Sequence, residues 1–316
     1  MKKIMILPLT LSIFLTACSG TELRDQLFIS EIGADHTDNM SMTLRLYDKE
    51  DILSGEGDSF FSALSDCESG QGKHLFAGHL EVFALSPHRF KDDLMTVLQN
   101  DRISPSCHVL CVKENASGFI ADNNKKLGEI IDSGGRNGLI VPKNIGEVMN
   151  DLLEKDGKAA VPMMKDDKLT MAVVSENELI GTLTEDESRG LCWLCGGVSD
   201  LYIPIKTDEG ETDFHVIKSS TKITSQKLRE GCGIMTEIKI NGTAENGSID
   251  SDTVKKRLSE MVTTQCSLTI AKTVTGMGAD LFGIEKILNA KLLAMNETWE
   301  ETAHRLKFYY KVKIAE

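Results

Sequence analysis

The chain has 316 residues, of which 41% are hydrophobic and 26% charged, and its net charge at pH 7 is −13. This acidity argues against nucleic-acid binding and against docking on anionic lipid through a polybasic patch, because both need a basic surface. The length predicts two or three domains, and the hydrophobic share is too high for a disordered stalk.

The first element is a basic start, Lys2 and Lys3, followed by an apolar run over residues 4–17. This is the pattern of a secretory signal, and a run of about 14 residues is too short to cross a bilayer core of roughly 30 Å as a helix. The segment 15–18, Leu-Thr-Ala-Cys, resembles the lipobox of bacterial lipoproteins, in which the Cys thiol receives diacylglycerol before the peptide is cut. We therefore expect residues 1–17 to be a lipoprotein signal peptide and Cys18 to carry the lipid that anchors the chain outside the cytoplasm. A plain signal peptide with a coincidental cysteine is the alternative.

Hydrophobic patterning in the first half predicts alternating strands and helices. Met42, Leu44 and Leu46 alternate with polar residues, the period of a strand with one buried face. Asp58-Ser59 offers N-caps for the helix that follows. The predicted elements are strands at 42–47, 74–85 and 106–113, helices starting at 60 and spanning 90–98 and 145–155, and a glycine-containing, turn-rich passage at 115–142.

The second half shows clearer periodicity. Apolar residues from Val254 to Val274 recur at spacings of three, four and eight, which predicts one long helix over 252–275 that could cross a whole sheet. Thr184 can cap a helix whose first turn is acidic. The other predicted elements are strands at 169–174, 178–182, 201–206, 213–218, 234–241 and 306–314, and a helix at 281–293. Runs of strands followed by helices favour an α+β fold of two to three domains, with mixed or antiparallel sheets packed against helices.

The cysteines beyond Cys18 number seven, so they cannot all pair within the chain. Cys107 and Cys111 flank an apolar segment, where cysteine often serves as a small hydrophobe. We expect most of these seven thiols to be free and buried. The remaining five are Cys67, Cys192, Cys195, Cys232 and Cys266.

Two groups of residues could carry thiol or metal chemistry. Cys192 and Cys195 have Cys-x-x-Cys spacing, but the expected helix places them near its C-terminus, where the dipole disfavours a thiolate. A zinc site would need two further ligands, for which Cys232 and His215 are the only plausible residues. We therefore favour structural thiols over a redox or zinc site.

Four other features have a functional and a structural interpretation. Gly55 and Gly57 precede a helix but lack the rest of a dinucleotide fingerprint, so we favour a turn. Residues 134–138 could cradle an anion through backbone N–H groups, and we favour a surface turn. We interpret His79 as a core histidine in preference to an interface residue, and Glu185 with Glu187 as helix-start charges in preference to an acid–base pair.

Several short segments, in their order along the chain, resemble the Ger(x)C family, the lipoprotein C subunits of the nutrient germinant receptors of bacterial spores. The strongest is residues 181–194, Gly-Thr-Leu-Thr-Glu-Asp-Glu-Ser-Arg-Gly-Leu-Cys-Trp-Leu. The others are 76–82 with its Gly-His pair, 157–162, 279–283, and Trp299-Glu300 before the last strand.

The resemblance implies a non-enzymatic protein, without cofactor or catalytic residues, anchored on the outer face of the spore inner membrane. It also implies two membrane-embedded receptor subunits as partners, one of them transporter-like. Combined with the residue patterns, it divides the chain into a signal peptide (1–17), an N-terminal α/β region (18–165) that can comprise two subdomains, and a C-terminal α+β domain (166–316). The alternative is a solute-binding lipoprotein of an import system, which should have two βαβ lobes and a ligand cleft between them.

Overall fold

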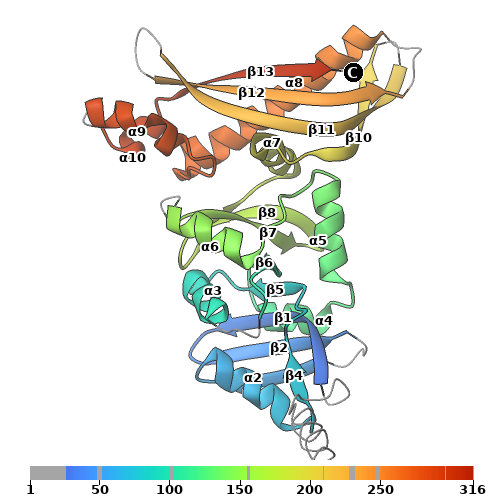
Figure 1. Cartoon of the computed structure of the whole chain (residues 1–316), viewed down its shortest axis with the longest axis vertical. Coiled ribbons are helices and arrows are strands. Elements are labelled where there is room, and N and C mark those ends of the chain that lie inside the picture. Colours follow the sequence, from blue (N-terminus) through green and yellow to red (C-terminus); the bar gives the residue numbers. More distant parts are fainter. Residues whose placement is uncertain are drawn as a thin grey trace, which may run out of the picture.

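The computed structural model describes residues 26–47, 52–99, 103–154, 157–208, 210–227, 232–245, 250–295 and 297–315. They form two sheets, each packed against helices, which lie one above the other along the long axis of the molecule (Figure 1). The predicted α+β class, with mixed sheets in more than one domain, is confirmed. Cys18 and residues 1–17 lie outside the described residues.

The lower domain is built on a nine-stranded mixed sheet. Its strand order is β3-β2-β1-β5-β6-β7-β8-β9, and β4 pairs with the first residues of β1. The central steps from β1 through β5 and β6 to β7 are parallel, and the flanking pairs are antiparallel. The strands are β1 (Gln26–His36), β2 (Met40–Leu46), β3 (Ile52–Gly57), β4 (His74–Phe76), β5 (Val82–Leu85), β6 (His108–Val112), β7 (Ala159–Lys165), β8 (Lys168–Val174) and β9 (Leu179–Thr182).

Helices cover both faces of this sheet. The apolar side chains of α2 (Phe60–Ser69), α3 (Phe90–Leu98) and α6 (Ile145–Glu154) join one core cluster. Those of α4 (Ala116–Asp122) and α5 (Leu127–Arg136) join a second cluster on the opposite face. Because both faces are covered, the central strands β5 and β6 are apolar along their length, as parallel strands buried on both sides must be.

Buried charges tie α4 and α5 to the sheet. The Arg45 guanidinium donates to the Glu31 carboxylate at 3.0 Å and to main-chain carbonyls at the end of α4. Glu31 also accepts the backbone N–H of Leu127, the first residue of α5, at 2.8 Å. Asp35 accepts two backbone N–H groups at the start of α4. These carboxylates satisfy helix N-termini that would otherwise be buried without partners.

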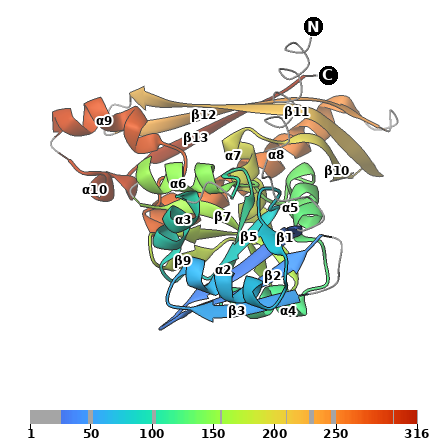
Figure 2. The same cartoon turned by 60° about the horizontal axis from the view of Figure 1, so that its bottom comes forward.

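The upper domain has a four-stranded sheet in the order β10-β11-β12-β13, with one parallel pair, β12 with β13. Its strands are β10 (Ser199–Thr207), β11 (Gly210–Lys227), β12 (Cys232–Ala244) and β13 (Lys307–Ala315). Figure 2 shows this sheet as a layer across one end of the molecule, with α7 (Glu185–Cys195) and α8 (Ser251–Ile270) between it and the lower domain. The smaller helices α9 (Ile284–Met295) and α10 (Trp299–Ala303) lie beyond α8.

The predicted long helix over 252–275 is confirmed, because α8 continues into a π-helical segment, Ala271–Gly276. Its buried stripe packs against the inner face of the four-stranded sheet. The first three strands of this sheet are antiparallel neighbours, and only β12 and β13 are parallel and joined through helices, so the sheet is not built from repeated parallel βαβ units like a lobe of a solute-binding protein.

Three sequence predictions differ from the structure. The passage 115–142, which was predicted to be rich in turns, contains the helices α4 and α5. Its glycines permit close packing: Gly134 faces inward, where a methyl group would overlap Leu169. The single strand expected at 74–85 is two short strands, β4 and β5. The boundary predicted between residues 165 and 166 falls within the β7–β8 hairpin, and residues 168–182 pair into the lower sheet.

Candidate functional site

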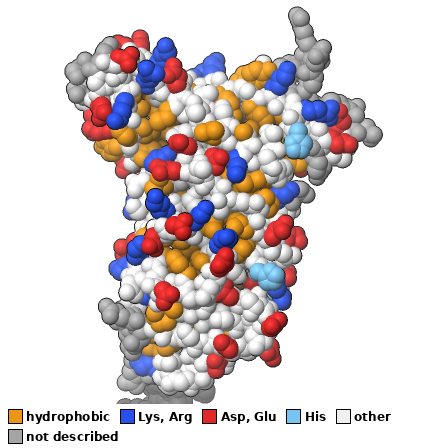
Figure 3. All heavy atoms as spheres, turned by 180° about the vertical axis from the view of Figure 1, so that it is seen from behind, with side chains coloured by type: hydrophobic (Ala, Val, Ile, Leu, Met, Phe, Trp, Pro, Cys, Tyr) orange, Lys and Arg blue, Asp and Glu red, His pale blue; other side chains and the backbone are white. Residues whose placement is uncertain are grey.

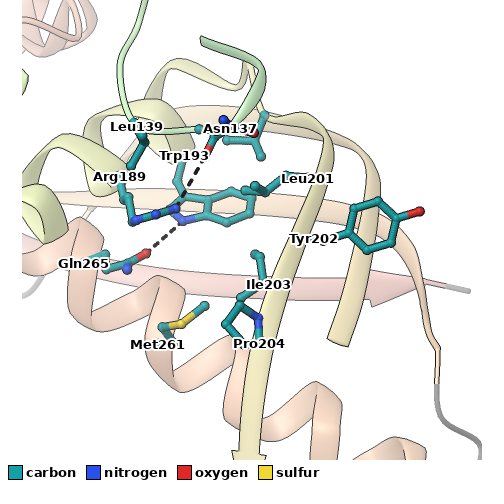
Figure 4. Close-up of a pocket in the computed structure, with 12 residues that line it drawn as sticks. Asn137, Leu139, Arg189, Trp193, Leu201, Tyr202, Ile203, Pro204, Met261 and Gln265 are labelled. Atoms are coloured by element: carbon teal, nitrogen blue, oxygen red, sulfur yellow. Dashed lines mark hydrogen bonds between the residues drawn. The ribbon is translucent and has the colours of Figure 1, made fainter. Parts of the chain in front are cut away.

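A cavity of about 440 Å³ lies where the two domains meet (Figure 4). Its walls come from the segment after α5, from α7 and the following strand β10, and from α8, three regions far apart in the sequence. Most of the lining is apolar. The lining residues are Asn137, Gly138, Leu139, Arg189, Trp193, Val198, Leu201, Tyr202, Ile203, Pro204, Met261 and Gln265.

Trp193 is the largest side chain in the wall and is only 2% exposed. Its indole Nε1–H donates to Gln265 Oε1 at 3.0 Å, and the Gln265 amide donates to Asp186 Oδ1 at 3.1 Å. This chain of hydrogen bonds joins α7 to α8. The two helices approach closely because Gly190 faces α8, where a methyl group would overlap Thr269 and the Gln265 carbonyl. Trp193 is therefore held in one orientation by packing and by its polar partner.

Arg189 forms the polar side of the cavity and links the two domains. Its guanidinium pairs with Glu185 at 3.1 Å. It also donates to the main-chain carbonyl of Asn137 at 3.5 Å, as Figure 4 shows. Tyr202 points away from the other lining residues (Figure 4). Among the described residues that line the cavity there is no carboxylate, histidine or thiol, so the lining offers binding surface and no acid–base pair.

The Cys-x-x-Cys pair lies in the last turn of α7, as predicted. Cys192 is buried, and burial raises the pKa of its thiol to about 12, whereas Cys195 is exposed. A reactive cysteine needs a lowered pKa, so this environment opposes thiolate chemistry at Cys192. The expectation of free, buried thiols is confirmed for Cys67, Cys107, Cys111, Cys192 and Cys266.

His215 and Cys232, which were the possible zinc ligands, are not brought together. His215 pairs with Thr243 near the end of β12, whereas Cys232 begins that strand. At about 3.4 Å per residue the two positions are more than 30 Å apart along the strand. His215 instead stacks on Tyr202, with ring centroids 4.2 Å apart, and bonds Asp200 at 2.8 Å. Among the described residues, no group of three His, Cys, Asp or Glu side chains could hold a metal ion.

The glycine motifs have structural roles that differ from those predicted. Gly55 and Gly57 lie in strand β3, not in a turn, and the backbone of α2 packs so closely on Gly55 that a methyl group would lie 2.6 Å from the Ala63 carbonyl. Residues 134–136 form the end of α5, and only Gly138, with φ of 57°, has the left-handed conformation of a turn. The surface-turn interpretation of 134–138 is therefore wrong for its first three residues.

The prediction that His79 is a core histidine is wrong, because this residue is exposed. Its ring packs against Phe28 and Phe76, with centroids 6.3 and 5.7 Å away. Glu185 and Glu187 do lie in the first turn of α7. Glu187 completes a capping box by accepting the backbone N–H of Thr184 at 2.7 Å.

None of the helices in the described part of the chain combines the length and the apolar composition that a membrane crossing requires.

Comparison with known proteins agrees with this architecture. Two family models match in tandem: the "Spore germination protein N-terminal domain" over residues 19–166 and "Spore germination B3/GerAC like, C-terminal" over residues 170–315. Spore germination protein B3 of Bacillus subtilis (strain 168) is 24% identical over an alignment of 198 residues, and the match covers 54% of this chain. The match covers 51% of that relative, so the chain spans about half the length of the curated protein it resembles.

A solved structure, the crystal structure of the GerBC protein, has the same fold. The two superpose with a TM-score of 0.59 and 15% sequence identity, over 90% of this chain and 97% of the other. Two sheet-and-helix domains, matched in order by an N-terminal and a C-terminal germination model, define a two-domain spore germination protein. Because the two models span nearly its whole length, the chain belongs to the Ger(x)C family, the B3/GerAC-like spore germination proteins.

Proposed function

We propose that the chain is the lipid-anchored C subunit of a nutrient germinant receptor and that spores need it to respond to nutrients. The tandem match to both germination domains carries this proposal. The lining of the junction cavity, which offers binding surface and no acid–base pair, supports a scaffolding role in preference to an enzymatic one.

The anchor would act at the lower end of the molecule. Seven residues separate Cys18 from Gln26, where β1 begins, and even fully extended the eight steps between the two Cα atoms span about 28 Å. The first residues of β1 pair with β4, which lies at the end of the molecule away from the four-stranded sheet (Figure 1). A lipid at Cys18 would therefore hold the N-terminal domain against the membrane and leave the C-terminal sheet away from it.

Anchoring explains how a protein without a membrane-spanning segment among its described residues could assemble with two membrane-embedded subunits, one of them transporter-like. The lipid confines the chain to the surface in which those partners diffuse, which raises their effective concentration. A two-chain lipid gives stable attachment where a single chain is marginal.

Germination of spores that lack the gene tests the proposal. We expect their suspensions to keep their optical density after addition of at least one amino acid or sugar that triggers wild-type spores, and the reintroduced gene to restore the response. Unchanged germination in every nutrient that triggers the wild type would refute a receptor role.

A further inference from the structure

One edge of the C-terminal sheet, strand β13, has no strand beyond it among the described residues. Its side chains alternate strictly. Lys307, Tyr309, Lys311 and Lys313 are exposed on the outer face, and the residues between them point to the inner face. The edge therefore has a basic outer row and an apolar inner row.

The inner row of β13 is incompletely buried. Phe308, Tyr310, Val312 and Ile314 pack against the core but are only half-buried. On the neighbouring strand β12, the inward-facing isoleucines 234, 238 and 240 are fully buried. The hydrophobic core thus continues past the last strand of the sheet, and one more strand would cover it.

The opposite edge of the same sheet differs. The inner row of β10, Leu201, Ile203 and Ile205, is only 3–7% exposed. Pro204 also lies in β10 and lacks the backbone N–H that an added strand would need. Of the two edges of this sheet, as the described residues form it, only the β13 edge therefore combines backbone groups without a strand partner and an uncovered apolar row.

The charge of the β13 edge is opposite to that of the whole chain. Glu237, on β12, accepts ion pairs from Lys313 at 2.9 Å and Lys239 at 3.8 Å, and these lysines hold its pKa below the ordinary value. Lys307 and Lys311 have no ion-pair partner within 4 Å among the described acids. Seen from behind, the upper part of the molecule shows hydrophobic side chains among both basic and acidic ones (Figure 3). A local basic row thus stands out on a chain of net charge −13.

Lysines along an edge strand also block self-association. If two copies paired through β13, their lysine rows would lie side by side on one face, and like charges on adjacent strands are destabilising. The same row favours a strand that carries carboxylates on alternate residues. The charge pattern thus discriminates between a second copy and an acidic partner.

We propose that β13 accepts an extended segment of a partner protein by β-augmentation, with alternating acidic and apolar residues. The partner's backbone would pair with β13, its apolar residues would cover the half-buried inner row, and its carboxylates would lie beside Lys307, Lys311 and Lys313. This inference goes beyond the proposed receptor role and does not depend on the lipid at Cys18.

A peptide-binding measurement on the purified protein tests it. The probe is a fluorescent peptide of nine residues, the length of β13, in which Glu and Val alternate. We expect saturable binding in fluorescence anisotropy. The Lys311→Glu/Lys313→Glu variant should bind the probe at least about tenfold more weakly, and should instead bind a peptide in which Lys and Val alternate. This recovery with reversed charge would exclude misfolding of the variant.

Two controls make the result specific to the edge. Lys206→Glu/Lys218→Glu makes the same change in net charge on the outer faces of β10 and β11, where neither residue is a cross-strand neighbour of Glu237 or of β13, and should leave binding within about twofold. A probe with an N-methyl group on every residue, which has no backbone N–H on either edge to donate to β13, should not bind. Absence of binding, equal binding to both double variants, or equal binding of the N-methylated probe would overturn the proposal. A dimer that forms through β13 in sedimentation would also overturn it.

Discussion

Replacement of Gly190 with alanine tests how the C-terminal domain holds α7 against α8. The glycine sits where the two helices cross, and a methyl group would overlap Thr269 Oγ1 and the main-chain carbonyl of Gln265. The carbonyl cannot rotate away as a side chain can, so the helices must separate. Separation would also strain the hydrogen bond from Thr269 Oγ1 to the Glu187 carbonyl, which is 2.7 Å long.

The expected cost can be worked out from these contacts. Overpacking costs about 1–3 kcal/mol, and loss of the hydroxyl hydrogen bond adds about 1 kcal/mol. The higher helix propensity of alanine offsets about 1 kcal/mol. We therefore expect Gly190→Ala to lower the free energy of unfolding of the C-terminal domain by about 2 kcal/mol, and its Tm by about 6 °C.

Urea unfolding followed by tryptophan fluorescence measures this change in the correct domain, because both tryptophans, Trp193 and Trp299, are buried there. Gly197→Ala is the matched control. It lies two residues past the end of α7, a methyl group there would meet no atom within 4 Å, and the change should stay within about 0.5 kcal/mol. Equal stability of the two variants would refute the close packing of α7 on α8.

Three further predictions concern single side chains. Burial raises the pKa of Glu31 above its usual 4.5, so the folded chain binds this proton more tightly than the unfolded chain. The stability of wild type relative to Glu31→Gln should therefore be greatest below about pH 4.5 and fall as the pH rises through the folded pKa; urea titrations in which that difference grows with pH would contradict this. Asp280→Ala removes the acceptor of three backbone N–H groups at the start of α9 and should cost about 1–2 kcal/mol in the same unfolding assay, and no loss would show that these bonds are dispensable. Iodoacetamide at pH 8 should modify Cys195 but not Cys192 in the native protein, since burial raises the pKa of Cys192 to about 12; peptide mass spectrometry showing equal modification would contradict its burial.

Periodicity predicted the elements whose environment is simple. The stripe from Val254 to Val274 and the alternation in 306–314 each face one layer of structure, so pattern and structure agree. The strand expected at 213–218 is in fact β11, Gly210–Lys227, because its second half pairs at full length with β12 but shows little alternation in polarity. Backbone pairing, which the side chains do not encode, extends it.

Glycine misled the interpretation of 115–142. Gly128 and Gly134 lie on the buried side of α5 beside Leu127 and Ile131, where small size permits close packing, and a pattern analysis treats them as helix breakers. The junction cavity could not be predicted, since its walls come from three regions distant in sequence, the segment after α5, the consecutive elements α7 and β10, and α8. The one available signal was Trp193, a large side chain with a polar atom that must find a partner when buried.

Lipidation of Cys18 is the claim on which the proposed assembly rests, and a Cys18→Ala strain tests it most directly. We predict that the wild-type protein fractionates with spore membranes, and that the variant is released into the soluble fraction or lost, together with the nutrient response. A variant that stays with the membranes and supports germination at the wild-type rate would contradict the account.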